Sequence, residues 1–214
     1  MFVLSTLSGN MSFMTSGKTN YHHGDLRAAL IEQTTEMITE TGLESITMRA
    51  LSERIGVSRT AAYRHFPNKI ELLNAVTEEG FIRFAAVLKE SRNDTSLDIK
   101  QSFDQMGSVY IKFALENQAF YRLMFSENQI SKENSHDLKI AGEAAFTELV
   151  ECLVEAQQAS LIKTENVKTQ ASLVWSTMHG ISSLLIDQRL EFEEGELPQF
   201  LKYMKDKLLI SLQN

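Results

Sequence analysis

The sequence has 214 residues but only one cysteine, Cys152, and two prolines. A single cysteine cannot form an internal disulfide, so the chain is not a disulfide-stabilised scaffold and suits a reducing compartment. Ten glycines accompany the two prolines, and so few helix-breaking residues favour long helices. No apolar run approaches the roughly 20 residues of a membrane helix, and the N-terminus lacks the basic region of a signal peptide. We therefore expect a soluble, cytoplasmic protein with no membrane partner.

Motifs of catalysis and metal binding are also missing. His22 and His23 are adjacent, so their rings would point apart on a helix, and no set of Cys or Asp residues has zinc-ligand spacing. The sequence has neither a phosphate-binding glycine-rich loop nor a G-x-S-x-G motif. His136 and Asp137 lie in the polar stretch SKENSHDLK, which we interpret as a loop, and Cys152 lies on an apolar helix that does not suit a redox sensor. The sequence predicts no enzyme, no metal site and no cofactor.

Helical periodicity is what the sequence does contain. Apolar residues recur at helical spacings over about 25–41, and this segment ends at Gly42. Asn68, with Glu71 three residues later, starts a longer helix whose apolar seam extends to Leu88. No stretch shows the polar–apolar alternation of a strand, and no internal repeat is present. The predicted fold class is therefore all-α.

Charge is unevenly distributed along this chain, whose formal net charge is −7. Residues 45–70 contain one acidic residue, Glu53. The same segment contains the basic residues Arg49, Arg54, Arg59, Arg64 and Lys69. A basic patch on an acidic body suggests that an anionic partner docks at one place. Charge alone equally allows a basic helix face that is simply solvated.

The segment RIGVSRTAAYRHFPNK, residues 54–69, combines these basic residues with turn and cap signals. Thr47 can cap a short helix, Gly56 can form a left-handed turn, and Ser58 can cap a second short helix that ends before Pro67. This layout is that of a helix-turn-helix, whose second helix enters the major groove of DNA. The arginines thus gather where a phosphate backbone would lie. The outward positions of the second helix would be the hydrogen-bond donors Arg59, Thr60, Tyr63, Arg64 and His65.

The segment ITMRALSERIGVSRTAAYRHFPNKIELLNAV resembles the DNA-binding domain of the TetR/AcrR family of transcriptional regulators. The similarity rests on the TMRALS entry, the GVS turn and the YRHFPNK end, and the preceding YHHGDLRAAL is typical of one branch of the family. The stretches WSTMHGISSLLIDQRL (175–190) and FALENQAFYRLMFS (113–126) resemble the WHG-type C-terminal domain of that branch. Ser52 and Ala61 depart from the family pattern, which usually has Ala at the first position and Gly or a small hydroxyl residue at the second.

The resemblance implies an N-terminal three-helix DNA-binding domain and a C-terminal helical domain that binds a ligand and dimerises. The family pattern places five residues on DNA: Thr47, Arg59, Tyr63, His65 and Lys69. Arg59, Thr60 and Arg64 are the candidates for contacts with base edges, because Arg can bind guanine through two parallel hydrogen bonds. The full predicted DNA-binding set is Thr47, Arg49, Ser58, Arg59, Thr60, Tyr63, Arg64, His65 and Lys69.

Aromatic and methionine side chains recur at helical spacings between residues 103 and 125. The family uses this region as an inducer pocket, and such side chains adapt to irregular apolar ligands, although core packing also explains any one of them. Trp175 and His179 could add an indole and an imidazole; the alternative for His179 is a hydrogen bond to a backbone carbonyl. The acidic body argues for a small neutral or cationic apolar effector. The predicted ligand-binding set is Phe103, Tyr110, Phe113, Tyr121, Met124, Trp175 and His179.

Two apolar seams near the C-terminus suggest dimerisation. One extends from Val167 to Leu185 and the other from Leu197 to Leu208, with apolar residues three and four positions apart. Two such helices per subunit would form a four-helix bundle across a two-fold axis. Packing of either seam against the chain's own core is the alternative.

The sequence therefore predicts a flexible tail over 1–20, a helix-turn-helix DNA-binding domain over 21–67 and a regulatory, ligand-binding and dimerisation domain over 68–214. The predicted function is transcription regulation by a ligand-responsive repressor that binds a palindromic operator in double-stranded DNA as a homodimer. One alternative is an activator or architectural DNA-binding protein without a ligand. Another is an enzyme or ligand carrier built on the same helical body.

Overall fold

The computed structural model describes residues 26–126 and 136–213, and every regular element in that part of the chain is a helix. The all-α prediction is confirmed. The predicted tail over 1–20, and His22 and His23, lie outside the described residues. The elements are α1 (Leu26–Thr41), the 3-10 turn η1 (Leu43–Ser45), α2 (Met48–Ile55), α3 (Arg59–His65), α4 (Lys69–Arg92), α5 (Ile99–Glu116), α6 (Gln118–Met124), α7 (His136–Gln158), α8 (Val167–Ile186) and α9 (Glu196–Gln213).

The second and third helices begin and end where their cap residues predict. The hydroxyl oxygens of Thr47 and Ser58 accept the backbone N–H groups of Ala50 and Ala61, each at 3.1 Å. Gly56, which joins α2 to α3, has a φ of 77°, a left-handed conformation that favours glycine. The predicted succession of short helix, turn and short helix is therefore confirmed.

The three N-terminal helices enclose a small core of their own. Phe66 is 3% exposed, and the guanidinium of Arg27 lies 5.4 Å from the centre of its ring. The hydroxyl of the buried Ser52 donates to the carbonyl oxygen of Met48 at 2.7 Å, so its departure from the family's usual Ala leaves no unpaired donor. Other members of this core are Leu30, Ile38, Leu51 and Ala62.

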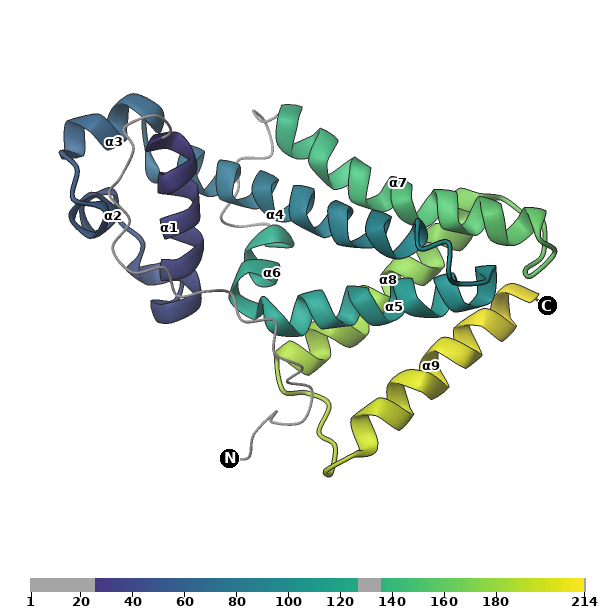
Figure 1. Cartoon of the computed structure of the whole chain (residues 1–214). Coiled ribbons are helices and arrows are strands. Elements are labelled where there is room, and N and C mark those ends of the chain that lie inside the picture. Colours follow the sequence, from purple (N-terminus) through teal and green to yellow (C-terminus); the bar gives the residue numbers. More distant parts are fainter. Residues whose placement is uncertain (1–25, 127–135, 214) are drawn as a thin grey trace.

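The long helix α4 connects the two parts of the molecule. It starts beside α3 and continues through the body, where it packs along α7 and against α5 and α6 (Figure 1). The N-terminal helices also contact the body directly, because α1 packs against both α4 and α6. The buried face of α4 includes the predicted seam residues Leu73, Val76, Gly80, Phe84 and Leu88.

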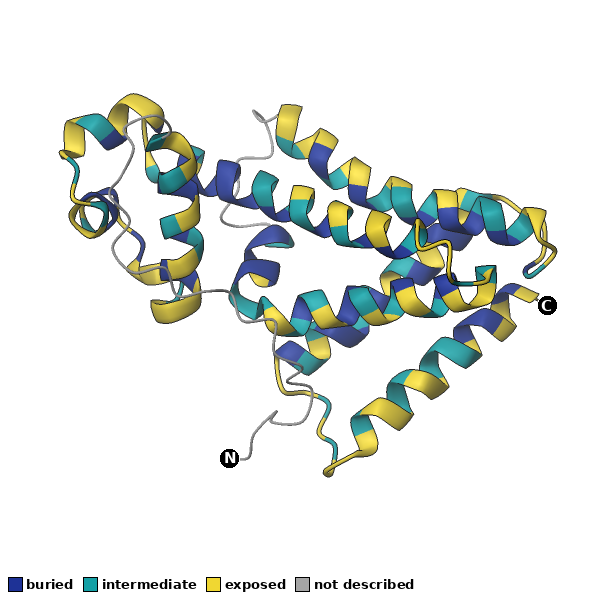
Figure 2. Cartoon of the chain, in the orientation of Figure 1, coloured by how far each residue is buried: buried dark blue, intermediate teal, exposed yellow. Residues whose placement is uncertain are grey.

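Burial in the body follows the helical period. Figure 2 shows buried stripes on α4, α5 and α8, whereas the N-terminal half of α9 is exposed or only partly buried. At the far end of α4, the guanidinium of Arg92 lies 3.1, 2.6 and 2.8 Å from carboxylate oxygens of Glu148, Glu151 and Glu155. These ion pairs fasten the C-terminal end of α4 to α7.

The structure overturns the predicted loop around His136. From this residue onward the chain is helical, because α7 begins at His136 and carries Asp137 in its first turn. A carboxylate at that position interacts favourably with the partial positive charge of the helix N-terminus. The polar residues from His136 to Lys139 therefore form the start of a helix.

The apolar seam of α8 that was predicted to form the dimer interface is buried in the chain's own core instead. Its central residues pack inside the chain itself, so the sequence alternative of core packing is the correct one for this seam. The periodicity shows that one face of α8 is apolar, but it does not tell which partner covers that face. The residues concerned, at most 7% exposed, are Ala171, Val174, Met178 and Ile181.

Candidate DNA interface and ligand cavity

Helix α3 presents hydrogen-bond donors on the outer surface of the helix-turn-helix. The predicted base-reading residues Arg59, Thr60 and Arg64 are exposed, as are His65 and Tyr63, the last with 48% exposure. Ala62 on the opposite face is completely buried, so the helix has a fixed inner side. With seven residues, α3 is about 10 Å long, a size that fits the roughly 12 Å width of the major groove.

Thr47 and Ser58, also predicted to bind DNA, are the exposed cap residues of α2 and α3. Each hydroxyl oxygen already accepts one backbone N–H, but its own proton is still available as a donor. The N-terminus of a helix favours an anion through its unpaired N–H groups and its dipole. Both positions therefore suit a phosphate oxygen.

Arg49 and Lys69 lie on either side of α3 in the sequence, and each has a weak intramolecular partner. Arg49 Nε donates to Glu53 Oε1 at 2.8 Å, with side chains 73% and 64% exposed. Lys69 Nζ donates to the backbone carbonyl of Leu43 at 3.3 Å. An ion pair as exposed as Arg49–Glu53 contributes little to stability because water screens it, so a phosphate can replace the carboxylate easily.

Arg54 is exposed, but it pairs with side chains of α1 and is not a free donor of this surface. Its guanidinium donates to Gln33 at 2.9 Å and to Glu36 at 3.2 Å, and it also binds Glu40. The hydrogen bond between them lowers the pKa of the Glu40 carboxyl and raises the pKa of Arg54. The sequence argument that the arginines of residues 45–70 gather on phosphate is wrong for Arg54, whose partners lie 14 to 21 positions away.

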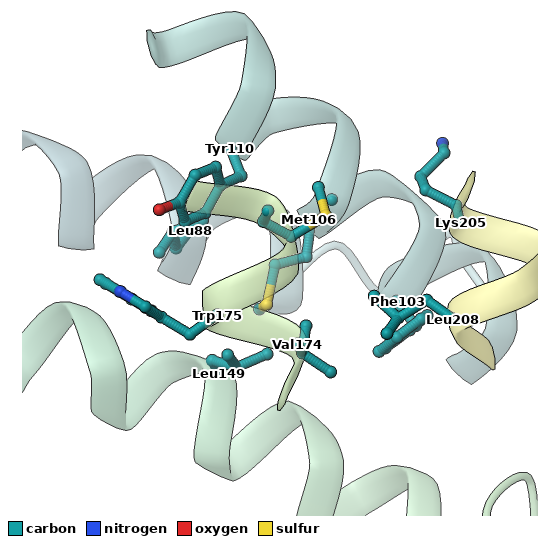
Figure 3. Close-up of a pocket in the computed structure, with 11 residues that line it drawn as sticks. Leu88, Phe103, Met106, Tyr110, Leu149, Val174, Trp175, Lys205 and Leu208 are labelled. Carbon is teal, nitrogen blue, oxygen red and sulfur yellow. The ribbon is translucent and has the colours of Figure 1, made fainter. Parts of the chain in front are cut away.

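An apolar cavity lies in the body where α4, α5, α7, α8 and α9 meet (Figure 3). Its volume is about 30 Å³, well below the roughly 300–1,000 Å³ of ordinary ligand pockets. Figure 3 shows Lys205 at the edge of the group, with its ammonium directed away from the other side chains. The lining consists of Leu88, Phe103, Met106, Gly107, Tyr110, Leu149, Val174, Trp175, Met178, Lys205 and Leu208.

Three of the predicted ligand-binding residues, Phe103, Tyr110 and Trp175, line this cavity. Met106 belongs to the aromatic and methionine set expected between residues 103 and 125, but sequence reasoning missed Met178 and the aliphatic side chains of the lining, whose only signal was the helical periodicity shared by every core position. It also missed Lys205, because nothing in the sequence distinguishes this lysine from the others on α9.

Two other predicted residues, Phe113 and Met124, pack nearby against α4. The rings of Phe113 and Phe84 have centres 4.9 Å apart. Met124 contacts α4 where the absence of a side chain on Gly80 lets the helices approach: a Cβ at that position would lie 2.9 Å from Met124 Cγ. Both residues connect α4 with the helices that surround the cavity.

The remaining two, Tyr121 and His179, form a buried hydrogen-bond chain next to the cavity. The hydroxyl of Tyr121 is 2.9 Å from the hydroxyl of Tyr110 and 2.8 Å from Nδ1 of His179. Burial raises the pKa of both phenols, that of Tyr121 to about 12, and lowers the pKa of His179. The chain is therefore uncharged at neutral pH, and it ties α5, α6 and α8 together.

Other kinds of site find no support in the part of the chain that the structure describes. Within residues 26–126 and 136–213, no three His, Cys, Asp or Glu side chains are grouped to hold a metal ion. No helix in these ranges combines the length and the apolar character that crossing a membrane requires. Cys152 is buried, which raises its pKa to about 12 and keeps the thiol protonated and unreactive.

Two family profiles match the chain. The profile described as bacterial regulatory proteins of the tetR family matches residues 30–76, from α1 into α4. The profile described as the tetracyclin repressor-like C-terminal domain matches residues 103–208. The first match includes every exposed donor of α3, and the second includes all the cavity residues except Leu88.

Similar proteins share these two regions unequally. The class C tetracycline repressor of Escherichia coli is 44% identical over 52 residues, 24% of this chain and 24% of the repressor. The transcriptional activator FasR of Mycolicibacterium smegmatis is 23% identical over 142 residues, 64% of each chain. Both alignments span less than two thirds of the relative's length. A solved structure of a protein of unknown function from Rhodococcus sp. RHA1 has a TM-score of 0.81 and 26% identity, covering 92% of this chain and 100% of that one.

Proposed function

This chain belongs to the TetR family of DNA-binding transcriptional regulators, and we propose that it is a dimeric, ligand-responsive repressor acting on a palindromic operator. The tetracycline repressor and FasR, two of the relatives that it matches, regulate transcription, and the chain is not an enzyme. The observation that carries the proposal is the course of α4, a single helix that starts beside the exposed donors of α3 and reaches the apolar cavity at Leu88. We place its action in the cytoplasm, where bacterial DNA lies.

The proposed division of labour follows the two packed parts of the molecule. Residues 21–67 would bind DNA and residues 68–214 would bind the effector and dimerise. Arg59, Thr60 and Arg64 are proposed to contact base edges, since their donors are exposed along α3. The proposed contacts with phosphate and sugar are Thr47, Arg49, Ser58, Tyr63, His65 and Lys69.

The proposed dimer uses the face of α8 that the chain's own core leaves uncovered, together with α9. Leu173 and Leu184 on α8 are 48% and 44% exposed, and Tyr203 and Ile210 on α9 are 58% and 46% exposed. Gly180 lies between the two leucines on the same face, and a Cβ there would meet nothing within 4 Å. A second copy of the chain could approach closely along this face and form a bundle across a two-fold axis.

The proposed response to ligand depends on the small size of the cavity. An effector of ordinary size must displace lining side chains, and one of these, Leu88, belongs to α4. A shift of α4 would move α3 in each subunit, and a dimer on a palindrome needs its recognition helices about 34–36 Å apart. Coupling energies of about 1–3 kcal/mol are typical for such effectors, which is enough to release a promoter.

The proposal is tested by selecting bound duplexes from a random DNA pool with the purified protein. We expect palindromic sites with half-site centres one helical turn apart, and increased transcription from a promoter that carries such a site when the gene is deleted. Decreased transcription after deletion would identify an activator instead. Binding without any sequence preference would contradict the proposed function and favour an architectural role.

A further inference from the structure

The lining of the cavity is apolar on all sides but one. Apart from Lys205, it is made of aliphatic, aromatic and thioether side chains. The hydroxyl of Tyr110 is already bonded to Tyr121, and the indole N–H of Trp175 can only donate. Besides the Tyr110 hydroxyl, which is already engaged, the polar groups of the lining side chains, the indole N–H and the ammonium of Lys205, are donors only.

Lys205 is a cation without a counter-ion in the described part of the chain. Its ammonium donates to the backbone carbonyl of Asp104 at 3.1 Å and to the hydroxyl of Ser108 at 2.7 Å, both neutral oxygens on α5. No described carboxylate forms an ion pair with it. An ammonium has three donors, so one donor and the whole charge are available to a ligand.

A glycine on α5, Gly107, allows the side chain of Lys205 to pack closely against that helix. Because Gly107 has no side chain, the stem of Lys205 lies against it, and a Cβ at Gly107 would be 3.1 Å from Cδ of Lys205 and 3.4 Å from Cε of Met178. The stem thus forms part of the apolar wall while the ammonium stays at the edge, as Figure 3 shows. Lys205 therefore offers an apolar stem to the chain of an amphiphile and a positive charge to its head group.

We propose that the effector is an anionic amphiphile, an aliphatic chain with a carboxylate, whose chain enters the cavity and whose carboxylate binds Lys205. This inference rests on the proposed function, since it names the ligand class of the same cavity. It replaces the neutral or cationic effector expected from the net charge of −7. Charges beyond a Debye length of about 8–10 Å are screened, whereas an ammonium in contact with a carboxylate forms a charge-assisted hydrogen bond.

Entry requires the cavity to enlarge, and the packing of α9 shows where this happens. On α9 only Leu208, Leu209 and Leu212, in its last two turns, are buried, while the residues before Lys205 are exposed or partly buried. Met106 and Met178 face the same opening and have flexible side chains that can repack around an aliphatic chain. The chain would enter between α5 and α9, beside the ammonium that holds its head group.

The single tryptophan of the sequence, Trp175, lines the cavity and reports binding directly through its fluorescence. The intact protein is titrated with decanoate, 1-decanol and decyltrimethylammonium below their micelle concentrations. We expect decanoate to bind about tenfold or more tightly than decanol, and the cation to bind weakest. Equal affinities for the three, or no saturable change in fluorescence with any of them, would overturn the proposal.

Two variants locate the head group. In Lys205→Met the stem and its contact with Gly107 remain, so decanol should bind as before while the preference for decanoate disappears. The control Lys202→Met, on the same helix but 80% exposed and paired with Asp206, should bind all three like the wild type. Persistence of the full preference for decanoate in Lys205→Met would refute the assignment.

Operator titrations with and without decanoate separate this inference from the proposed function. If decanoate quenches Trp175 and lowers operator affinity, both stand. If it quenches Trp175 and operator affinity stays constant, the carboxylate site is real and the ligand-responsive function is wrong. If another effector releases the operator and decanoate never binds, the function stands and the carboxylate site is wrong.

Discussion

At the scale of single residues, the body contains one polar chain that must stay uncharged. His179 and Tyr121 are linked by a bond of 2.8 Å and surrounded by aromatic rings, with the ring of Phe125 centred 4.4 Å from the imidazole. Burial lowers the pKa of His179 below its ordinary 6.5 because the charged imidazolium loses solvation. The unfolded chain therefore takes up this proton at a higher pH than the folded chain does.

This difference predicts a dependence of stability on pH. The contribution of His179 to the free energy of unfolding is complete above pH 6.5 and is lost as the pH falls from there through the lower folded pKa. We expect His179→Gln to flatten the decline of the melting temperature between about pH 7 and pH 5. The variant His65→Gln, on the exposed face of α3, is the matched control and should follow the wild type. Identical profiles for the wild type and His179→Gln would contradict the prediction.

The donors of α3, and Lys69 at the start of α4, predict two kinds of binding defect. Arg59→Ala or Arg64→Ala should cost about 1–3 kcal/mol on the operator and relax the preference at one base pair. Lys69→Ala should weaken binding to every DNA sequence by the same factor and make binding less dependent on salt concentration, because it removes a contact with phosphate. Titrations against the operator and its single-base variants measure both effects. If both arginine variants bind every operator variant more weakly by the same factor, these arginines do not contact base edges.

At the scale of elements, the crossing of α4 and α6 leaves less room for a Cβ than any other described glycine position. A Cβ on Gly80 would lie 2.8 Å from Cζ of Phe120 and 2.9 Å from Cγ of Met124. Helix α6 also packs on α1, and Arg122 holds it to α8 by donating to the carbonyl of Ile186 at 2.8 Å. A short helix thus touches the DNA-binding part, α4 and the cavity wall at once.

Filling that contact should destabilise the fold. Gly80→Ala gains up to about 1 kcal/mol of helix propensity but overpacks the crossing, which costs about 1–3 kcal/mol. We expect a net loss in the free energy of unfolding in urea. Gly142→Ala on α7 is the control, because a Cβ there meets nothing within 4 Å and should leave stability equal or higher. A stabilised Gly80→Ala variant would show that α6 can move away freely.

The boundaries of the first helices were predictable from the sequence because their causes are local. Thr47, Ser58 and Asn68 each accept an N–H three residues ahead, and Gly56 acts through its own φ. The partners of side chains were not predictable in this way. Arg54 binds α1, and Lys205 binds α5 from 97 to 101 positions away. Only the assembled fold brings such groups together, so composition and periodicity could mark them as basic or apolar without naming a partner.

At the scale of the whole molecule, the uncovered face of α8 predicts the oligomeric state. Leu173→Glu with Leu184→Glu places two charges on the proposed two-fold interface, at positions that are 48% and 44% exposed in the single chain. We expect a folded monomer in light scattering, with unchanged helicity. Its operator binding should be much weaker, because a dimer binds both halves of a palindrome at once and a monomer binds only one. The control Ile140→Glu alters a residue of α7 that is 50% exposed, and it should remain dimeric. A dimeric double variant would place the interface elsewhere.

The close contact at Gly80 has a consequence for how α4 would transmit a movement. The helix has 24 residues and is about 36 Å long. If it turns about Gly80, the arm to Leu88 at the cavity is about 12 Å and the arm to Lys69 beside α3 is about 16 Å. A displacement of α4 at Leu88 would then produce a displacement at Lys69 that is about a third larger. A pivot closer to the cavity would increase the ratio of the two arms. The sensitivity of the response would then change without any substitution in the cavity or the recognition helix.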